Sequence, residues 1–180
     1  MIEDRSGRKN YREAGMPKVY AMSTYFFLSL MLNGPKGMER WTKNVDVFDY
    51  DLILVPIHQE VHWCLAVVDF RSPGVFYYDS MDGHNMPALS LILEYLKVEH
   101  LKKRKTELDA RQYVREIVED SPKQENEDDC GIFACKAAEF LSRDVTLQFS
   151  QQDMPYYRKL MVYEITKKCL LSERPLICDF

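Results

Sequence analysis

The middle of the chain carries apolar patterns that are typical of β-strands. Residues 52–57 form a continuous apolar run, which predicts a strand that is buried on both faces. Pro56 lies in this run and is predicted to be near a strand end or a bulge, because proline cannot donate to the ladder. Two further β-rich runs, 62–70 and 74–79, are joined by a short polar link. This arrangement predicts an antiparallel hairpin.

Apolar residues spaced three and four apart predict helices after these strands. The first stripe consists of Met86, Leu89, Leu93 and Leu96. A second helix is expected to begin at about Cys130, because Asp129 is a preferred N-cap residue. A third is expected after Asp153, with Pro155 in its first turn. Central strands with helices on either side predict an α+β fold.

The first third of the chain is less distinctive. Residues 1–16 are polar and fit either the end of a helix or a mobile lead-in. Residues 19–32 are apolar and aromatic, and their pattern fits a helix or a strand equally well. A length of 180 residues suits one domain, so residues 1–180 are predicted to form a single domain.

Composition and charge exclude several classes of protein. The chain is 46% hydrophobic and 29% charged, which is typical of a globular protein. Its 24 basic and 28 acidic residues give a net charge of -4, which argues against general nucleic-acid binding. No apolar run has the length of a membrane span, and the polar start does not resemble a secretory signal. We therefore expect neither nucleic acid nor membrane as a partner.

The cysteines suggest both a compartment and a chemistry. The chain has five of them, Cys64, Cys130, Cys135, Cys169 and Cys178. An odd number without a close pair favours a reducing compartment, the nucleus or the cytoplasm. Cys130 is the best candidate nucleophile, because the first turn of a helix favours a thiolate and Gly131 allows another backbone to approach. The alternative is that Cys130 is simply a small buried residue. Cys64 and Cys135 are predicted to serve packing.

A nucleophilic thiol needs a base, and the base needs an acceptor that orients it. His62 opens one strand of the predicted hairpin, and Asp79 ends the other. A turn centred on residues 70–71 places the two directly opposite, with β-carbons about 5 Å apart. A turn centred on residues 72–73 instead places Asp79 opposite Ala66, roughly 13 Å from His62. The pairing of His62 with Asp79 therefore depends on the register.

A metal site is a weaker interpretation of the same region. The sequence from His58 to His62 has the spacing of a zinc signature, but its glutamate is central and its context is β rather than helical. We expect no metal there.

Three groups of residues together resemble the SUMO-specific cysteine proteases, also called sentrin-specific or Ulp-like proteases. They are His62-Trp63, Tyr78-Asp79-Ser80-Met81, and Gln124 with five residues between it and Cys130-Gly131. Arg40-Trp-Thr-Lys43, the stretch 53–63 and Ser142-Arg-Asp144 add to the likeness, which runs from about residue 1 to residue 171.

The resemblance implies a papain-like cysteine protease fold, in which helices flank a mixed or antiparallel sheet. It implies a thiol isopeptidase that cleaves after the C-terminal Gly-Gly of SUMO, in deconjugation or in precursor maturation. By position, Cys130 is implied as the nucleophile, His62 as its base and Asp79 as the residue that orients the imidazole. Gln124 is implied as a donor to the oxyanion hole. Trp63 is implied as one wall of a narrow tunnel that admits only glycine.

The resemblance also implies what accompanies this activity. The expected partners are SUMO or SUMO-conjugated proteins, the expected state is a monomer, and no cofactor is implied. The family has a Trp-Leu-Asn-Asp-type segment that forms the opposite tunnel wall, and the chain starts too late to contain it. The N-terminal part of the family domain is therefore expected to be missing. The missing wall leaves open a non-catalytic SUMO-binding pseudoprotease. A protease for NEDD8 is a further alternative, because related folds reuse the same triad.

Overall fold

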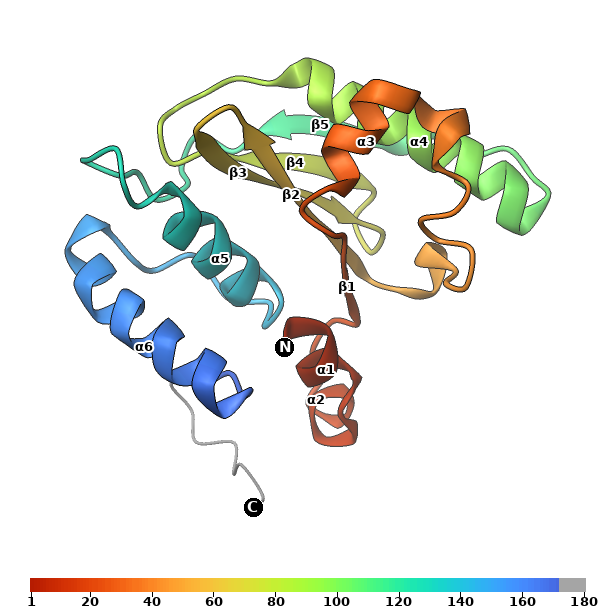
Figure 1. Ribbon diagram of the computed structural model, residues 1–180. Coiled ribbons are helices and arrows are strands. Elements are labelled where there is room, and N and C mark those ends of the chain that lie inside the picture. Colours follow the sequence, from red (N-terminus) through yellow and green to blue (C-terminus); the bar gives the residue numbers. More distant parts are fainter. Residues whose placement is uncertain (172–180) are drawn as a thin grey trace.

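The computed structural model describes residues 1–171, so residues 172–180, and Cys178 with them, lie outside the described residues. A five-stranded sheet in the order β1-β2-β3-β4-β5 forms the centre (Figure 1). Its strands are β1 (Val19–Ala21), β2 (Leu52–Gln59), β3 (His62–Asp69), β4 (Gly74–Tyr78) and β5 (Val114–Ile117). The α-helices are α1 (Ile2–Gly7), α2 (Lys9–Glu13), α3 (Phe26–Asn33), α4 (Met86–Arg104), α5 (Cys130–Leu141) and α6 (Met154–Lys167). Short 3-10 helices are η1 (Pro35–Met38), η2 (Val47–Asp49), η3 (Ala110–Gln112) and η4 (Gln151–Asp153).

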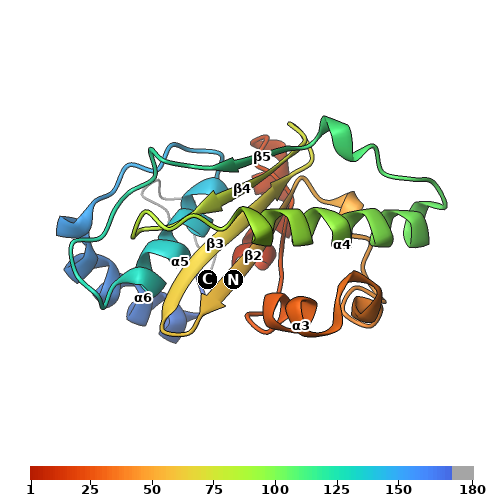
Figure 2. The ribbon, with the colours of Figure 1, turned by 90° about the horizontal axis from the view of Figure 1, so that it is seen from above.

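The sheet is mixed, which confirms the predicted α+β class. Strands β2, β3 and β4 pair antiparallel, whereas β1 and β5 add to the two edges in parallel. In Figure 2, α4 lies across the near side of the strands, and α5 and α6 are grouped together away from α3 and α4. In the described part of the chain, no helix is both long and apolar enough to span a membrane.

Each face of the sheet packs against a different set of helices. On β3, Cys64 and Ala66 belong to the core that includes α3 and α4, whereas Leu65 and Val67 belong to the core that includes α5 and α6. Because successive strand residues point to opposite faces, a strand between two helical layers is apolar at every position. This accounts for the continuous apolar run in β2.

The first third of the chain combines the alternatives that its sequence left open. The apolar segment 19–32 contains both a short strand, β1, and a helix, α3. The polar start forms α1 and α2, and Arg5 of α1 is buried in an ion pair with Glu139 of α5, at 2.6 Å. Of the two predictions for residues 1–16, the helix is the one observed.

Pro56 does not mark a strand end or a bulge, so that prediction was wrong. It lies inside β2, opposite Leu65 in an unbroken ladder. The carbonyl of Leu54 accepts a hydrogen bond from Met22 on the β1 side, and backbone groups alternate along a strand, so the nitrogen of Pro56 faces the same side. Strand β1 pairs only as far as Leu54, which leaves this edge open at Pro56.

The hairpin forms as predicted, but neither expected register is correct. The ladder runs from Asp69 opposite Gly74 to Leu65 opposite Tyr78, so the turn is centred between Arg71 and Ser72. The carboxylate of Asp69 accepts hydrogen bonds from the backbone N–H groups of Arg71 and Ser72, at 2.8 and 3.3 Å. This local turn chemistry sets a four-residue loop. The next step of the ladder places Asp79 opposite Cys64 rather than opposite His62.

Candidate active site

His62 and Asp79 nevertheless meet. The Nε2 atom of His62 lies 2.7 Å from Oδ1 of Asp79, and Asp79 is only 4% exposed. The two residues are diagonal neighbours on one face of the hairpin, because His62 lies two positions before Cys64. Diagonal neighbours are within reach of a long or aromatic side chain. The structure therefore brings together two of the residues that the sequence singled out, by a different geometry from the one expected.

The carboxylate of Asp79 is held by three donors. Besides His62, it accepts hydrogen bonds from the backbone N–H of Met81, at 2.8 Å, and from the thiol of Cys64, at 3.2 Å. Burial alone would raise the pKa of Asp79, but the hydrogen bonds from Met81, His62 and Cys64 outweigh it and hold the pKa below its usual range. Asp79 is therefore a charged acceptor at neutral pH.

This charge fixes the tautomer of His62. An ionised carboxylate can only accept, so Nε2 of His62 carries the hydrogen, and in the neutral imidazole Nδ1 carries the lone pair. Within residues 1–171, Nδ1 is buried and has no hydrogen-bond partner. A buried acceptor without a partner is costly, and one in a polar site is available to take a proton.

Cys130 begins α5, as predicted, and is 7% exposed. Its helix starts beside the strand that carries His62, since a β-carbon added to Gly131 would lie 3.8 Å from Cδ1 of Trp63. The first turn of α5 and the His62–Asp79 pair thus lie at the same end of the sheet.

Asp129 occupies the N-cap position of α5, but its side chain does not cap the helix. The carboxylate instead accepts hydrogen bonds from Asn126 at 2.7 Å, from Gln151 at 2.7 Å, and from Nε of Arg158 at 2.8 Å. Burial favours the neutral form, but these donors outweigh it and hold the pKa of Asp129 below its usual range. The carboxylate therefore leaves the first N–H groups of α5 to other acceptors.

Gln124 is docked against the segment that follows β4. Its backbone N–H donates to the carbonyl of Ser80 at 2.8 Å, and its side-chain oxygen accepts from the hydroxyl of Ser80 at 2.6 Å. Its side-chain NH₂ donates to the carbonyl of Asn126. The structure thus ties Gln124 to the neighbour of Asp79, while its amide donor is turned toward its own loop.

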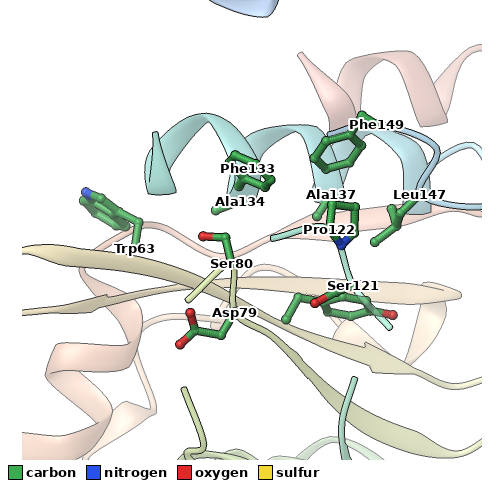
Figure 3. A pocket seen from close by; sticks show the side chains of 11 residues that line it. Trp63, Asp79, Ser80, Ser121, Pro122, Phe133, Ala134, Ala137, Leu147 and Phe149 are labelled. Atoms are coloured by element: carbon green, nitrogen blue, oxygen red, sulfur yellow. The ribbon is translucent and has the colours of Figure 1, made fainter. Parts of the chain in front are cut away.

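Trp63 is half-buried and stacks on His58, its cross-strand partner, with ring centroids 4.2 Å apart. Figure 3 shows Trp63 and Ser80 between the end of the sheet and α5, with Asp79 pointing away from that helix. His58 therefore serves as a platform for the indole. It does not belong to the metal-like group of the described residues, which consists of His62, Cys64 and Asp79.

Trp63 also borders an apolar groove of about 430 Å³ between α1, α5, α6 and the sheet. Cys135 lines this groove and is exposed, so its assignment to core packing was wrong. Position 135 faces the groove, while Phe133 and Ala137 face the sheet. Cys64 is buried as predicted, but packing is not its only contact, because it donates to Asp79.

Sequence reasoning missed three contributors to the site, Cys64, Gln151 and Arg158. Cys64 could be linked to Asp79 only once the register was known. Gln151 and Arg158 lie more than twenty residues after Asp129, and a polar residue in a helix-start segment carries no local sign of such a contact.

An imidazole fixed by a buried carboxylate, beside a helix that begins with a cysteine, defines the class of papain-like cysteine proteases. The model of the Ulp1 protease family, C-terminal catalytic domain, matches residues 3–171. The chain belongs to this family of cysteine proteases.

Curated relatives agree with this assignment. A sentrin-specific protease of Caenorhabditis elegans is 42% identical over 173 residues, which cover 96% of this chain and 24% of that protein. Sentrin-specific protease 2 of Rattus norvegicus is 40% identical over 162 residues, which cover 89% of this chain and 28% of that protein. The chain thus spans about a quarter of the length of these relatives.

Solved structures confirm the fold. The C-terminal Ulp1 protease domain in complex with Smt3, the yeast ortholog of SUMO, superposes with a TM-score of 0.73 at 28% identity and covers 92% of this chain and 74% of that one. The Ulp1-like SUMO protease catalytic domain of Chaetomium thermophilum gives a TM-score of 0.78 at 23% identity, with 97% and 69% covered. The papain-like α+β architecture is therefore shown.

Proposed function

We propose that this chain is a thiol isopeptidase that cleaves after the C-terminal Gly-Gly of SUMO. The observation that carries the proposal is the His62–Asp79 pair, whose second imidazole nitrogen is buried and unpartnered within the described residues. A lone pair in this position is what a neighbouring thiol needs in order to lose its proton. Relatives named as sentrin-specific proteases, and the Ulp1 domain that binds the yeast ortholog of SUMO, support the choice of modifier.

In the proposed reaction, Nδ1 of His62 takes the proton of the Cys130 thiol, and the thiolate attacks the carbonyl carbon of the terminal glycine. The carbonyl oxygen becomes an oxyanion in a tetrahedral intermediate. When this intermediate collapses, the C–N bond breaks, and the imidazolium gives its proton to the leaving amine. A water molecule, deprotonated by His62, then hydrolyses the thioester, which restores the thiol and releases the SUMO carboxylate.

Other groups of the site stabilise the charges that develop during this reaction. The carboxylate of Asp79 stabilises the imidazolium and holds the tautomer in which Nδ1 is basic. Backbone N–H groups at the start of α5 and the amide of Gln124 donate to the oxyanion, at about 3 to 4 kcal/mol for a well-placed donor. The NH₂ of Gln124 has two hydrogens, and one of them is donated to the carbonyl of Asn126 in the free enzyme.

Trp63 supplies the specificity in this proposal. Its indole lies beside Gly131, on the path that a substrate tail would take to Cys130. A flat ring at van der Waals distance from the tail leaves no room for a side chain, so only glycine fits. Processing and deconjugation share this chemistry and differ only in the leaving amine. Monomeric state and a nuclear or cytoplasmic location remain predictions.

The test is cleavage of a SUMO fusion by the wild-type chain and by Cys130→Ala, with NEDD8 and ubiquitin fusions in parallel. The proposal expects SUMO cleavage by the wild type alone, while Cys130→Ala still binds SUMO. Binding without turnover by the wild type would instead identify a SUMO-binding pseudoprotease. Faster cleavage of the NEDD8 fusion would change the modifier and keep the enzyme.

A further inference from the structure

The side chain of Gln151 spans the loop that connects Gln124 to Cys130, the two residues nearest the proposed oxyanion. Residues 125–129 separate Gln124 from Cys130, and Gln151 contacts both ends of this segment. The Nε2 atom of Gln151 donates to Oδ2 of Asp129 at 2.7 Å, and its Oε1 accepts from the backbone N–H of Glu125 at 2.9 Å. One amide group therefore binds the residue after Gln124 and the residue before Cys130.

Gln151 lies in a segment that is held by its own local hydrogen bonds. It is the first residue of η4, whose N-cap Ser150 and third residue Asp153 form a reciprocal capping box. The backbone N–H and the hydroxyl of Ser150 both donate to Oδ2 of Asp153, at 2.8 and 3.2 Å. Helix α6 begins directly afterwards and supplies Arg158 to the other oxygen of Asp129. The hydrogen bonds between Ser150 and Asp153 that hold Gln151 in place therefore do not involve the loop that Gln151 binds.

Arg158 and Gln151 do different things for Asp129. Arg158 lies 2.5 Å from Oδ1 and neutralises the carboxylate, but it does not reach Glu125 by any hydrogen bond within residues 1–171. Gln151 is neutral and adds little charge stabilisation. Asn126 links the loop to Asp129 from within the loop. Gln151 binds both ends of the loop, at Glu125 and Asp129, from outside it.

We propose that Gln151 is a positioning residue, which holds the amide of Gln124 at the distance from Cys130 that the oxyanion requires. This inference rests on the proposed function. The amide of Gln124 also donates to the carbonyl of Asn126 within the loop, so the position of the loop sets the position of the amide. Gln151 keeps both ends of the loop in place. A displacement of about 1 Å at a reacting group can cost a hundredfold in rate.

The experiment is a double-mutant cycle on SUMO-fusion cleavage, with Gln151→Ala, Gln124→Ala and the double variant. Gln151→Ala is expected to lower kcat at least about tenfold and to change KM less than about twofold, because a transition-state contact is lost. In the Gln124→Ala background the same substitution is expected to have little further effect, because it acts through Gln124. The pH dependence of Cys130 alkylation by iodoacetamide and the Tm should stay close to the wild-type values.

Gln152→Ala is the matched control, since Gln152 is the exposed neighbour and makes no side-chain hydrogen bond in the described part of the chain. It should cleave at the wild-type rate. A kcat of Gln151→Ala within twofold of the wild type, or fully additive losses in the double variant, would overturn the positioning role. So would a large fall in Tm with altered alkylation, which would assign a structural role. A wild-type chain without turnover would be a different result, the failure of the proposed function itself.

Discussion

The imidazole of His62 reaches the carboxylate of Asp79 across the diagonal of a hairpin, at 2.7 Å between Nε2 and Oδ1. The residue directly opposite Asp79 is Cys64, whose thiol takes the other carboxylate oxygen at 3.2 Å. Each oxygen of Asp79 thus has its own donor on β3. The register of the β3–β4 hairpin, set by the loop at Asp69, decides whether the pair exists at all.

Asp79→Asn is expected to lower kcat by about 10²- to 10⁴-fold and leave the fold intact, because an amide can donate to Nε2 and reverse the tautomer of His62. Steady-state kinetics on a SUMO fusion and thermal unfolding measure the two effects. Asp120→Asn, at an exposed position, serves as the control and should have wild-type activity. Near-normal turnover by Asp79→Asn would show that the carboxylate does not orient the base.

Cys64 is expected to support Asp79 as a hydrogen-bond donor. Burial holds the pKa of the Cys64 thiol above its usual range, so it remains an S–H group at neutral pH. Cys64→Ala removes the donor and should destabilise the fold by about 1 to 2 kcal/mol, whereas Cys64→Ser keeps a donor. Urea unfolding compares the two variants, and the pH profile of kcat reports on Asp79. Equal behaviour of the alanine and serine variants in both assays would rule out the donor role.

Trp63 is expected to decide which tail enters the site. In the wild type, replacing a glycine of the SUMO Gly-Gly tail by alanine should slow cleavage by about 10- to 200-fold, the range for one extra methyl group in a tight pocket. In Trp63→Ala this penalty should shrink, although cleavage of the normal tail also falls. The ratio of kcat/KM for the two tails measures the effect. An unchanged ratio in Trp63→Ala would place the selective wall elsewhere.

The buried carboxylate of Glu139 makes stability depend on pH. Burial disfavours its charge, but Arg143, Lys136 and Arg5 outweigh burial and hold the pKa of Glu139 below its usual range. A lowered pKa in the folded state means that this stabilisation is complete above the unfolded pKa of about 4.3 and is lost as the pH falls through the folded value.

Urea unfolding between pH 7 and pH 3 should therefore show stability falling on the acid side of about pH 4. At pH 7, Glu139→Gln should cost about 3 to 5 kcal/mol, because it leaves buried cations without their partner. Glu94→Gln, which removes an exposed pair with Lys97, should cost little. If the two variants were equally stable, the buried network would contribute nothing specific.

The central strands β2, β3 and β4 and the helices α4, α5 and α6 could be predicted from periodicity, because they carry regular apolar patterns. The edge strand β5 could not, since its four residues include Arg115 and Glu116 and are mostly exposed. The start of α5 at Cys130 was also predictable, but the use of Asp129 was not. Its carboxylate binds Arg158 and Gln151, and a helix start cannot reveal partners so far along the chain. The hairpin register depends on two hydrogen bonds from backbone N–H groups to the carboxylate of Asp69. Counting the residues between the two strands could not predict these bonds, so it could not predict the register.

The pairing of the proposed catalytic residues could also be predicted only in part. His62 and Asp79 could be named as partners, but the sequence offered only the direct pairing, whereas the structure uses the diagonal one. Cys135 shows the opposite error. A helical stripe identifies which residues share a side of α5, but it cannot show that part of this side faces an open groove.

The most direct measurement is labelling with a SUMO probe that carries a C-terminal vinyl sulfone, followed by mass mapping of the modified residue. A single adduct on Cys130 is expected, which is absent in Cys130→Ala and forms much more slowly in His62→Ala. A wild-type chain that binds the probe without forming the adduct, or an adduct on Cys135 or another thiol, would contradict the assignment of Cys130 as the nucleophile.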